Sequence, residues 1–231
     1  MGYGRILCFC EHRRYIPCWE EKSHSGDFRG GKTLVWQDYI PENIQQRYEV
    51  RDYHHAATIL ANDFRGECKE VCGALLGFQI TTSDITAKGG NESAIPKKFS
   101  AILRPLGWKE EKLQANLVID DKTVSSDTHR IDYVKGRVAL DVEWNSKDQT
   151  FDRDLYAFRT FFEFGKISVA VLITRSEQLN PIFGKLGVMG KYGASTTHVG
   201  KLWPRLDASR HGGCPVLVFG ITPASITDWK G

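Results

Sequence analysis

The run from Ile131 to Trp144 constrains the fold of this chain more than any other feature. Side chains of a β-strand alternate between two faces with a period of two. Residues 137–144 follow that alternation, with an apolar face made of Val138, Leu140 and Val142 and a second face made of Ala139, Asp141 and Glu143. With a two-residue turn at Lys135-Gly136, the run predicts a β-hairpin whose second strand has an acidic face.

The predicted turn sets the register of this hairpin. It places Asp132 opposite Ala139, on the face that carries Asp141 and Glu143. Asp132 and Asp141 are then diagonal neighbours, roughly 7–8 Å apart at the backbone, and three carboxylates converge. The alternative is an ordinary solvated strand face, on which acids two residues apart are common.

Carboxylate oxygens without sulfur or imidazole favour Mg²⁺ over Zn²⁺ as the bound ion. Without a cation the cluster is unfavourable, because neighbouring carboxylates oppose each other's ionisation. A divalent ion at this position polarises a phosphodiester and lowers the pKa of a bound water. The hairpin therefore predicts a site able to hydrolyse a phosphodiester.

The rest of the sequence alternates helical and strand patterns, which indicates an α/β fold. Asp52 is positioned to cap a helix, Pro96 opens another, and Thr81 to Glu92 is expected to be a polar loop. Helical spacing is found in three sets of residues: Ala56, Ile59 and Leu60; Cys68, Val71, Cys72 and Leu75; and Phe151, Leu155, Phe158 and Phe162. Ile167–Thr174 and Val216–Ile221 are apolar runs typical of strands covered on both faces.

We expect an extension at residues 1–43 and one catalytic and DNA-binding domain at 44–231. No apolar run approaches the roughly 20 residues of a membrane span, and the first residues lack a signal-peptide pattern, so a cytoplasmic protein without membrane contact is expected. The net charge of +3 neither requires nor excludes nucleic acid. The six cysteines are expected to be free thiols; four residues form a candidate zinc site, with free thiols as its alternative: Cys8, Cys10, His12 and Cys18.

The Ile131–Trp144 run resembles the active-site hairpin of BglII/BstYI-like type II restriction endonucleases, which belong to the PD-(D/E)xK nuclease superfamily. Their form of the motif is Asp, eight intervening residues, an acid, any residue, then Glu or Gln. Asp52–Leu60, Gly107–Glu110 and Pro215–Ile221 also resemble segments of that family. The resemblance covers about residues 50–222.

This resemblance implies a restriction-endonuclease-like mixed central β-sheet flanked by α-helices, in a homodimer that surrounds double-stranded DNA. It makes Asp132 and Asp141 ligands of Mg²⁺. Asp141 stands where Glu is more usual, and Glu143 where the superfamily has Lys and close relatives have Gln. Glu143 is then expected to act as general base or to orient the attacking water. Glu111, with Glu110 as the alternative, matches the position of an upstream acid that completes such sites; both are otherwise solvated glutamates in a charge run.

Two segments are candidates for reading DNA, because they offer hydrogen-bond donors and positive charge. The first follows the catalytic strand and contains Asn145, Ser146 and Lys147. The second is a donor-rich stretch, otherwise an ordinary solvated loop, that contains Lys185, Lys191, Tyr192, Ser195, Thr196, Thr197, His198, Lys201, Arg205, Arg210 and His211.

The function implied is that of a type II, Mg²⁺-dependent endonuclease of a restriction-modification system, which cuts double-stranded DNA at a short palindrome. Two alternatives remain open at this stage. One is a repair or junction nuclease of the same fold, which recognises DNA structure rather than sequence. The other is a DNA-binding relative that has lost catalysis, suggested by the absent Lys and by Asp141.

Overall fold

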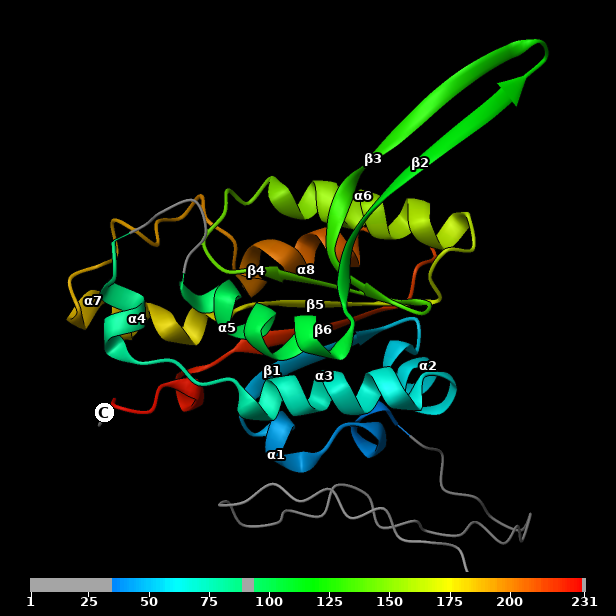
Figure 1. The fold of residues 1–231 in the computed structure, drawn as a ribbon. Helices are drawn as coiled ribbons and strands as arrows, with labels where there is room; N and C mark the ends of the chain where they lie inside the picture. Colours follow the sequence, from blue (N-terminus) through cyan, green and yellow to red (C-terminus); the bar gives the residue numbers. More distant parts are fainter. Residues whose placement is uncertain (1–34, 89–93, 230–231) are drawn as a thin grey trace, which may run out of the picture. The chain divides into compact units, whose positions relative to one another are not determined.

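The computed structural model describes residues 35–88 and 94–229. In this part of the chain the strands form one six-stranded sheet in the order β1-β6-β5-β4-β3-β2 (Figure 1). The strands are β1 (Tyr48–Tyr53), β2 (Lys109–Ile119), β3 (Lys122–Lys135), β4 (Val138–Glu143), β5 (Val169–Arg175) and β6 (Val216–Ile221). The β4-β5 and β5-β6 pairs are parallel and the others are antiparallel, so the mixed sheet that the sequence predicted is confirmed.

Helices cover both faces of this sheet. One layer contains α1 (Glu42–Gln45), α2 (Ala56–Asp63), α3 (Arg65–Gly77), α4 (Thr82–Thr86), α5 (Ala94–Leu103) and α7 (Asn180–Lys185). The other contains α6 (Thr150–Glu163) and α8 (Val199–Asp207). Short 3₁₀ helices lie at Trp36–Tyr39, Arg104–Leu106, Glu177–Leu179 and Pro223–Ser225. The α/β class with a central sheet flanked by helices is therefore also confirmed.

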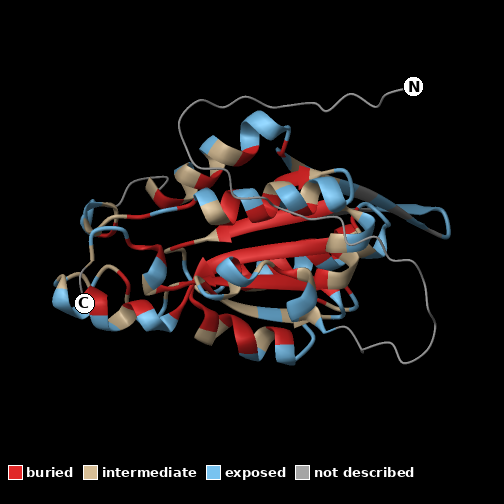
Figure 2. Cartoon of the chain, turned by 90° about the horizontal axis from the view of Figure 1, so that it is seen from below, coloured by how far each residue is buried: buried red, intermediate tan, exposed pale blue. Residues whose placement is uncertain are grey.

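Two central strands of the sheet are completely buried. Every residue of β5 and β6 is buried, as expected of apolar strands covered on both faces. Figure 2 shows these strands as a buried layer beneath the helices. β4 pairs with β5 along its whole length, from Val138↔Val169 to Glu143↔Thr174. The strand that carries Asp141 and Glu143 is thus held by a strand that is buried along its whole length.

The predicted register of the β3-β4 hairpin is wrong by two residues. Lys135 pairs with Val138 and Val134 with Ala139, so the turn is Gly136-Arg137 rather than Lys135-Gly136. Gly136 has φ of +56°, which the left-handed turn conformation requires and which glycine adopts without strain. Continued by one step, this register places Asp132 beside Asp141 rather than opposite Ala139.

Further elements differ from the sequence prediction. The segment from Thr81, expected to be a loop, contains α4, which begins with a capping box between Thr81 and Asp84. The second candidate DNA-reading segment contains the amphipathic helix α8, and the strands β1 and β2 were not predicted. The actual α4 follows a common rule, since Thr with an acid three residues later is an N-terminal helix signal.

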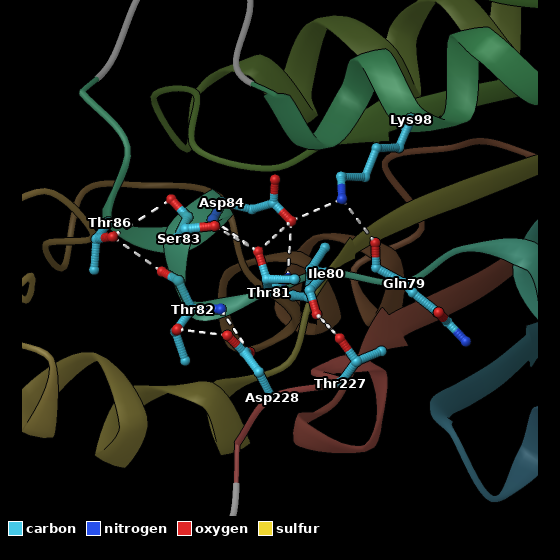
Figure 3. A network of polar contacts seen from close by, with 10 residues as sticks. All are labelled: Gln79, Ile80, Thr81, Thr82, Ser83, Asp84, Thr86, Lys98, Thr227 and Asp228. Atoms are coloured by element: carbon cyan, nitrogen blue, oxygen red, sulfur yellow. Dashed lines mark hydrogen bonds and ion pairs between the residues drawn. The ribbon is translucent and has the colours of Figure 1, made fainter.

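A polar network ties α4 to its neighbours (Figure 3). Lys98 of α5 donates to Asp84 Oδ2 at 2.7 Å and to the Gln79 carbonyl. At the end of the described chain, Asp228 accepts hydrogen bonds from the backbone N–H and the hydroxyl of Thr82. The network therefore anchors the segment after β6 to the helical layer on the far side of the sheet from α6.

The described residues begin inside the compact unit. Ile40 and Ile44 are already buried in its core, before or at the predicted start of the domain. The proposed zinc ligands Cys8, Cys10, His12 and Cys18 lie outside the described residues. Among the cysteines that are described, Cys68, Cys72 and Cys214 are buried thiols. Within the described ranges, no helix is both long and apolar enough to cross a membrane.

Candidate active site

Asp132 and Asp141 meet where the β3-β4 ladder ends. On its other side, β3 pairs Val134 with Lys109 and Ile131 with Glu111, so two residues of β3 oppose one residue of β2. Such a β-bulge bends the strand and re-aims its groups. The backbone N–H of Asp132 donates to Oδ1 of Asp141 at 2.7 Å. The acid predicted on β3 and the acid predicted on β4 are therefore brought together.

The Asp141 side chain is buried, with an exposed fraction of 3%. Burial raises the pKa of its carboxyl well above the usual range, and the nearby charges of Asp132 and Glu143 raise it further. The hydrogen bond from the Asp132 N–H opposes that rise. Ionised Asp141 is consequently unfavourable without a compensating positive charge.

Glu143 lies two residues beyond Asp141 on the same face of β4. Burial raises the pKa of its carboxyl to about 7, a hydrogen bond from Ser146 opposes the rise, and the charge of Asp132 adds to it. Within the described structure, Oε2 of Glu143 is buried without a hydrogen-bond partner. This oxygen is available to a water or a cation at the site.

The structure adds a fourth acid that the sequence analysis missed. Asp154 lies on the buried face of α6, between Phe151 and Phe158, with an exposed fraction of 3%. Burial raises the pKa of its carboxyl well above the usual range, followed by the charges of Asp141, Glu143 and Asp132. The helical spacing of the apolar residues already placed Asp154 on the core-facing side of α6, and a charged residue there was the available signal.

Arg153, the neighbour of Asp154, supplies positive charge beside these acids. Its charge lowers the pKa of both the Glu143 and the Asp154 carboxyls. The side chain is exposed, and its Nη2 donates to the Thr150 hydroxyl at 3.1 Å. A positively charged side chain of α6 thus lies near the acids. Glu143 occupies the position at which the motif described above more often has Lys.

The donor set is chemically suited to a hard divalent ion. In the described part of the chain, Oδ2 of Asp141, Oε2 of Glu143 and Oδ2 of Asp154 are buried oxygens without hydrogen-bond partners. No three His, Cys, Asp or Glu residues among those described form a ready-made metal-binding group. Mg²⁺ is usually held by one or two carboxylates, with waters and substrate phosphate as its other ligands. A pair of these acids fits that requirement.

The two upstream glutamates point to different partners. Glu111 lies beside Ile131 on the face of the sheet covered by α6, and its carboxylate is 3.7 Å from Nζ of Lys166. Glu110 forms an ion pair with Arg130. The charges that act most strongly on Asp141 come from Asp132 and Glu143. A role for Glu111 or Glu110 in the site stays a prediction.

The two candidate DNA-reading segments form one surface. Lys147 and Thr196 form an isolated antiparallel bridge. The N–H of Asp148 donates to the Ser195 carbonyl, and the N–H of Thr197 donates to the Ser146 carbonyl, both at 2.9 Å. This surface therefore begins directly after the acids of β4.

Ion pairs tie the combined surface to α6 and α8. Arg205 of α8 lies 3.5 Å from Asp148 and 3.1 Å from Asp152, and Arg210 pairs with Asp152. Arg210 is exposed. The network positions the segment after β4 relative to the two helices that cover the same face of the sheet.

The predicted DNA-binding residues differ in their accessibility. Lys147 is exposed, Asn145, Ser146 and Thr196 are half-buried, and Thr197 and His198 are buried. Nζ of Lys191 donates to the carbonyls of Ile85 and Ala87 at the end of α4. Among the wider set, Tyr192 and His211 are buried, and Nζ of Lys185 lies over the ring of Trp229. Direct contact with DNA bases therefore stays a prediction. It is easiest for the side chains that are exposed or half-buried.

A comparison with protein families matches residues 48–221 to the family described as restriction endonuclease BglII/BglIII. The match spans β1 to β6 and includes the four acids and the surface that follows β4. No curated protein matches the chain.

Proposed function

Because this chain belongs to the restriction endonuclease BglII/BglIII family, we propose that it uses Mg²⁺ to cut double-stranded DNA at a short palindromic sequence, as a homodimer. Membership makes it a type II restriction endonuclease, a hydrolase that binds and cleaves DNA. The metal, the target and the assembly are the parts that we propose.

The observation that carries the proposal is the contact between Asp132 and Asp141. The Asp132 N–H fixes Oδ1 of Asp141 and leaves its Oδ2 without a hydrogen-bond partner among the described residues. We assign Asp132 and Asp141 as the ligands of Mg²⁺. Bound there, Mg²⁺ would supply charge stabilisation for the phosphodiester and acidify a water.

The other groups act around this pair. Glu143, whose Oε2 has no hydrogen-bond partner among the described residues, accepts a proton from the attacking water or orients it. Arg153 provides positive charge beside the acids and is placed to neutralise the scissile phosphate. Glu111 is proposed as an accessory acid, because its side chain is on the same face of the sheet.

Recognition is assigned to the surface formed by the segments after β4 and before α8. Asn145 and Ser146 are proposed to reach base edges, while Lys147 and Arg210 hold phosphates. Lys191, Thr196, Thr197 and His198 support this surface from its second segment, in keeping with their backbone and carbonyl contacts. A palindrome has two-fold symmetry, so two copies of the chain would present one site to each strand.

The test is digestion of unmodified plasmid with the full chain, in MgCl₂ and in EDTA. Discrete fragments with identical ends, formed only in MgCl₂, are expected, and sequencing those ends gives the target and the cut position. Cleavage confined to branched or damaged DNA would identify a structure-specific nuclease instead. DNA binding without cleavage in any divalent cation would identify an inactive relative.

Assembly is tested separately, by light scattering on the eluted peak of a gel-filtration column. A protein mass of twice the 26.1 kDa of one chain is expected, both for the protein alone and, after the mass of the DNA is subtracted, for its complex with DNA. A chain that stays monomeric on its target DNA contradicts the homodimer while leaving the cleavage result untouched.

A further inference from the structure

Asp154 is a carboxylate in the protein core, where its charged form is energetically unfavourable. Its exposed fraction is 3%, and Oδ2 lacks a hydrogen-bond partner among the described residues. A charge removed from water without a partner is strongly unfavourable, and proteins normally pair such a group or use it to bind a metal. A residue retained only for packing at this position would be apolar, like its neighbours Phe151, Leu155 and Phe158.

Packing directs Asp154 toward the acidic face of β4. Phe151 and Phe158 belong to the same buried cluster as Ala139 and Leu172. Ala139 precedes Asp141 by two residues on one face of β4, and Leu172 is the residue paired with Asp141 on β5. The face of α6 that carries Asp154 therefore covers the part of the sheet that carries Asp141.

Asp141 lies between two other acids. Asp132 approaches it along the sheet, where its backbone N–H binds Oδ1 of Asp141. On the helix side, the strongest charge acting on Asp154 is that of Asp141, ahead of Glu143 and Asp132. Oδ2 of Asp141 and Oδ2 of Asp154 are both buried and without hydrogen-bond partners in the described structure. Two such oxygens provide the one or two carboxylates by which Mg²⁺ or Mn²⁺ is usually held.

The neighbouring arginine does not remove the need for a cation. Arg153 lowers the pKa of the Asp154 carboxyl, but this effect ranks behind burial and the three acids. Its side chain is exposed, and its hydrogen bond to the Thr150 hydroxyl is local to the start of α6.

We propose that Asp154 is a divalent-cation ligand, which together with Asp141 holds a metal ion on the α6 side of the site. This inference rests on the proposed metal-dependent function. It assigns a ligand outside the hairpin that carries the sequence motif. Asp141 would then bind metal together with Asp132 of β3 and also together with Asp154 of α6.

The experiment measures Mn²⁺ binding to the metal-free full-length protein by calorimetry, without DNA, for wild type, Asp154→Asn and Asp154→Glu. We expect Asp154→Asn to lose one bound ion per chain or at least tenfold in affinity, and Asp154→Glu, which keeps a carboxylate, to retain more binding than Asp154→Asn. Glu163→Gln, at the exposed end of the same helix, is the matched control and should bind as wild type does.

Thermal unfolding in EDTA separates a ligand from a structural residue. Asp154→Asn replaces a buried carboxyl, which ionises unfavourably, by a neutral amide of similar shape, so its Tm without metal should equal or exceed that of wild type. MnCl₂ should raise its Tm less than it raises that of wild type. Unchanged Mn²⁺ stoichiometry with affinity within twofold of wild type would overturn the inference alone. Absence of Mn²⁺ binding by wild type would also overturn the inference, whereas the proposed metal dependence is decided separately by plasmid cleavage in MgCl₂ and in EDTA.

Discussion

The backbone N–H of Asp132 donates a hydrogen bond to Oδ1 of Asp141 at 2.7 Å. The scaffold contribution of Asp132 shown by this bond is made by its main chain, whereas the proposed metal binding uses its carboxylate. A substitution that removes only the side chain should preserve this contact. That separation makes Asp132 the sharpest position at which to test the site.

Asp132→Ala should keep its fold and its DNA binding while losing about 100-fold or more in cleavage rate, because one proposed metal ligand is removed. Gel-shift titration in EDTA measures binding, and plasmid cleavage in MgCl₂ measures turnover. Asp63→Ala, at the exposed end of α2, is the control and should cleave and bind as wild type does. Wild-type cleavage by Asp132→Ala would reject the metal assignment.

Arg153 tests whether α6 supplies the positive charge that the motif lacks at Glu143. Arg153→Ala should lower the cleavage rate by about tenfold or more, since a cation beside a developing phosphate charge is lost. Arg159→Ala is the matched control, because Arg159 is exposed on the same helix and pairs with Glu163. Equal rates for the two variants under single-turnover conditions would show that Arg153 plays no part in the reaction.

Asn145 and Lys147 test the recognition surface through two different signatures. Asn145→Ala should reduce discrimination between the target and a one-base variant by about 1–3 kcal/mol, the value of one good base contact. Lys147→Ala should weaken binding to all sequences and reduce the salt dependence of affinity by about one unit of slope.

Both effects are measured by fluorescence anisotropy over a series of salt concentrations. Lys69→Ala, exposed on α3 in the opposite helical layer, should match wild type. If Asn145→Ala keeps full discrimination and Lys147→Ala keeps the wild-type salt slope, DNA is read by another surface.

The sequence was sufficient to predict the elements that hold the acids, because their patterns are long and regular. The buried strands β5 and β6 were found from continuous apolar runs, and the helix α6 was found from the helical spacing of its apolar residues. The hairpin was also found, but its register was not: Gly136 is compatible with either turn, and only pairing with β2 and β5 selects Gly136-Arg137. A bulge such as that beside Asp132 leaves no periodic signal.

Asp154 illustrates what local pattern cannot give. Its burial follows from the helical spacing of its neighbours, but its proximity to Asp141 depends on how α6 packs across the sheet. The joining of residues 145–148 to 195–197 is likewise a tertiary contact between segments about fifty positions apart. Such contacts become visible only when the whole sheet is assembled.

His211 should make the stability of the protein depend on pH. Its ring is buried, with an exposed fraction of 1%, and neither nitrogen has a hydrogen-bond partner among the described residues. Burial is the main cause that lowers its pKa to about 4, and the neighbouring His54, with ring centroids 5.1 Å apart, is the second cause. In the unfolded chain this residue binds a proton near the ordinary histidine pKa of 6.5, whereas in the native state its pKa is about 4.

Protonation therefore favours the unfolded chain between these two values. The stabilising contribution of neutral His211 is complete above pH 6.5 and is lost as the pH falls toward 4. His211→Asn should unfold in urea with a shallower loss of stability between pH 7 and 5, by at most about 1.4 kcal/mol per pH unit. Comparing the two slopes in EDTA cancels the contributions of the other histidines. Identical slopes for wild type and His211→Asn would contradict this prediction. They would mean that His211 is protonated in the native protein as readily as in the unfolded chain.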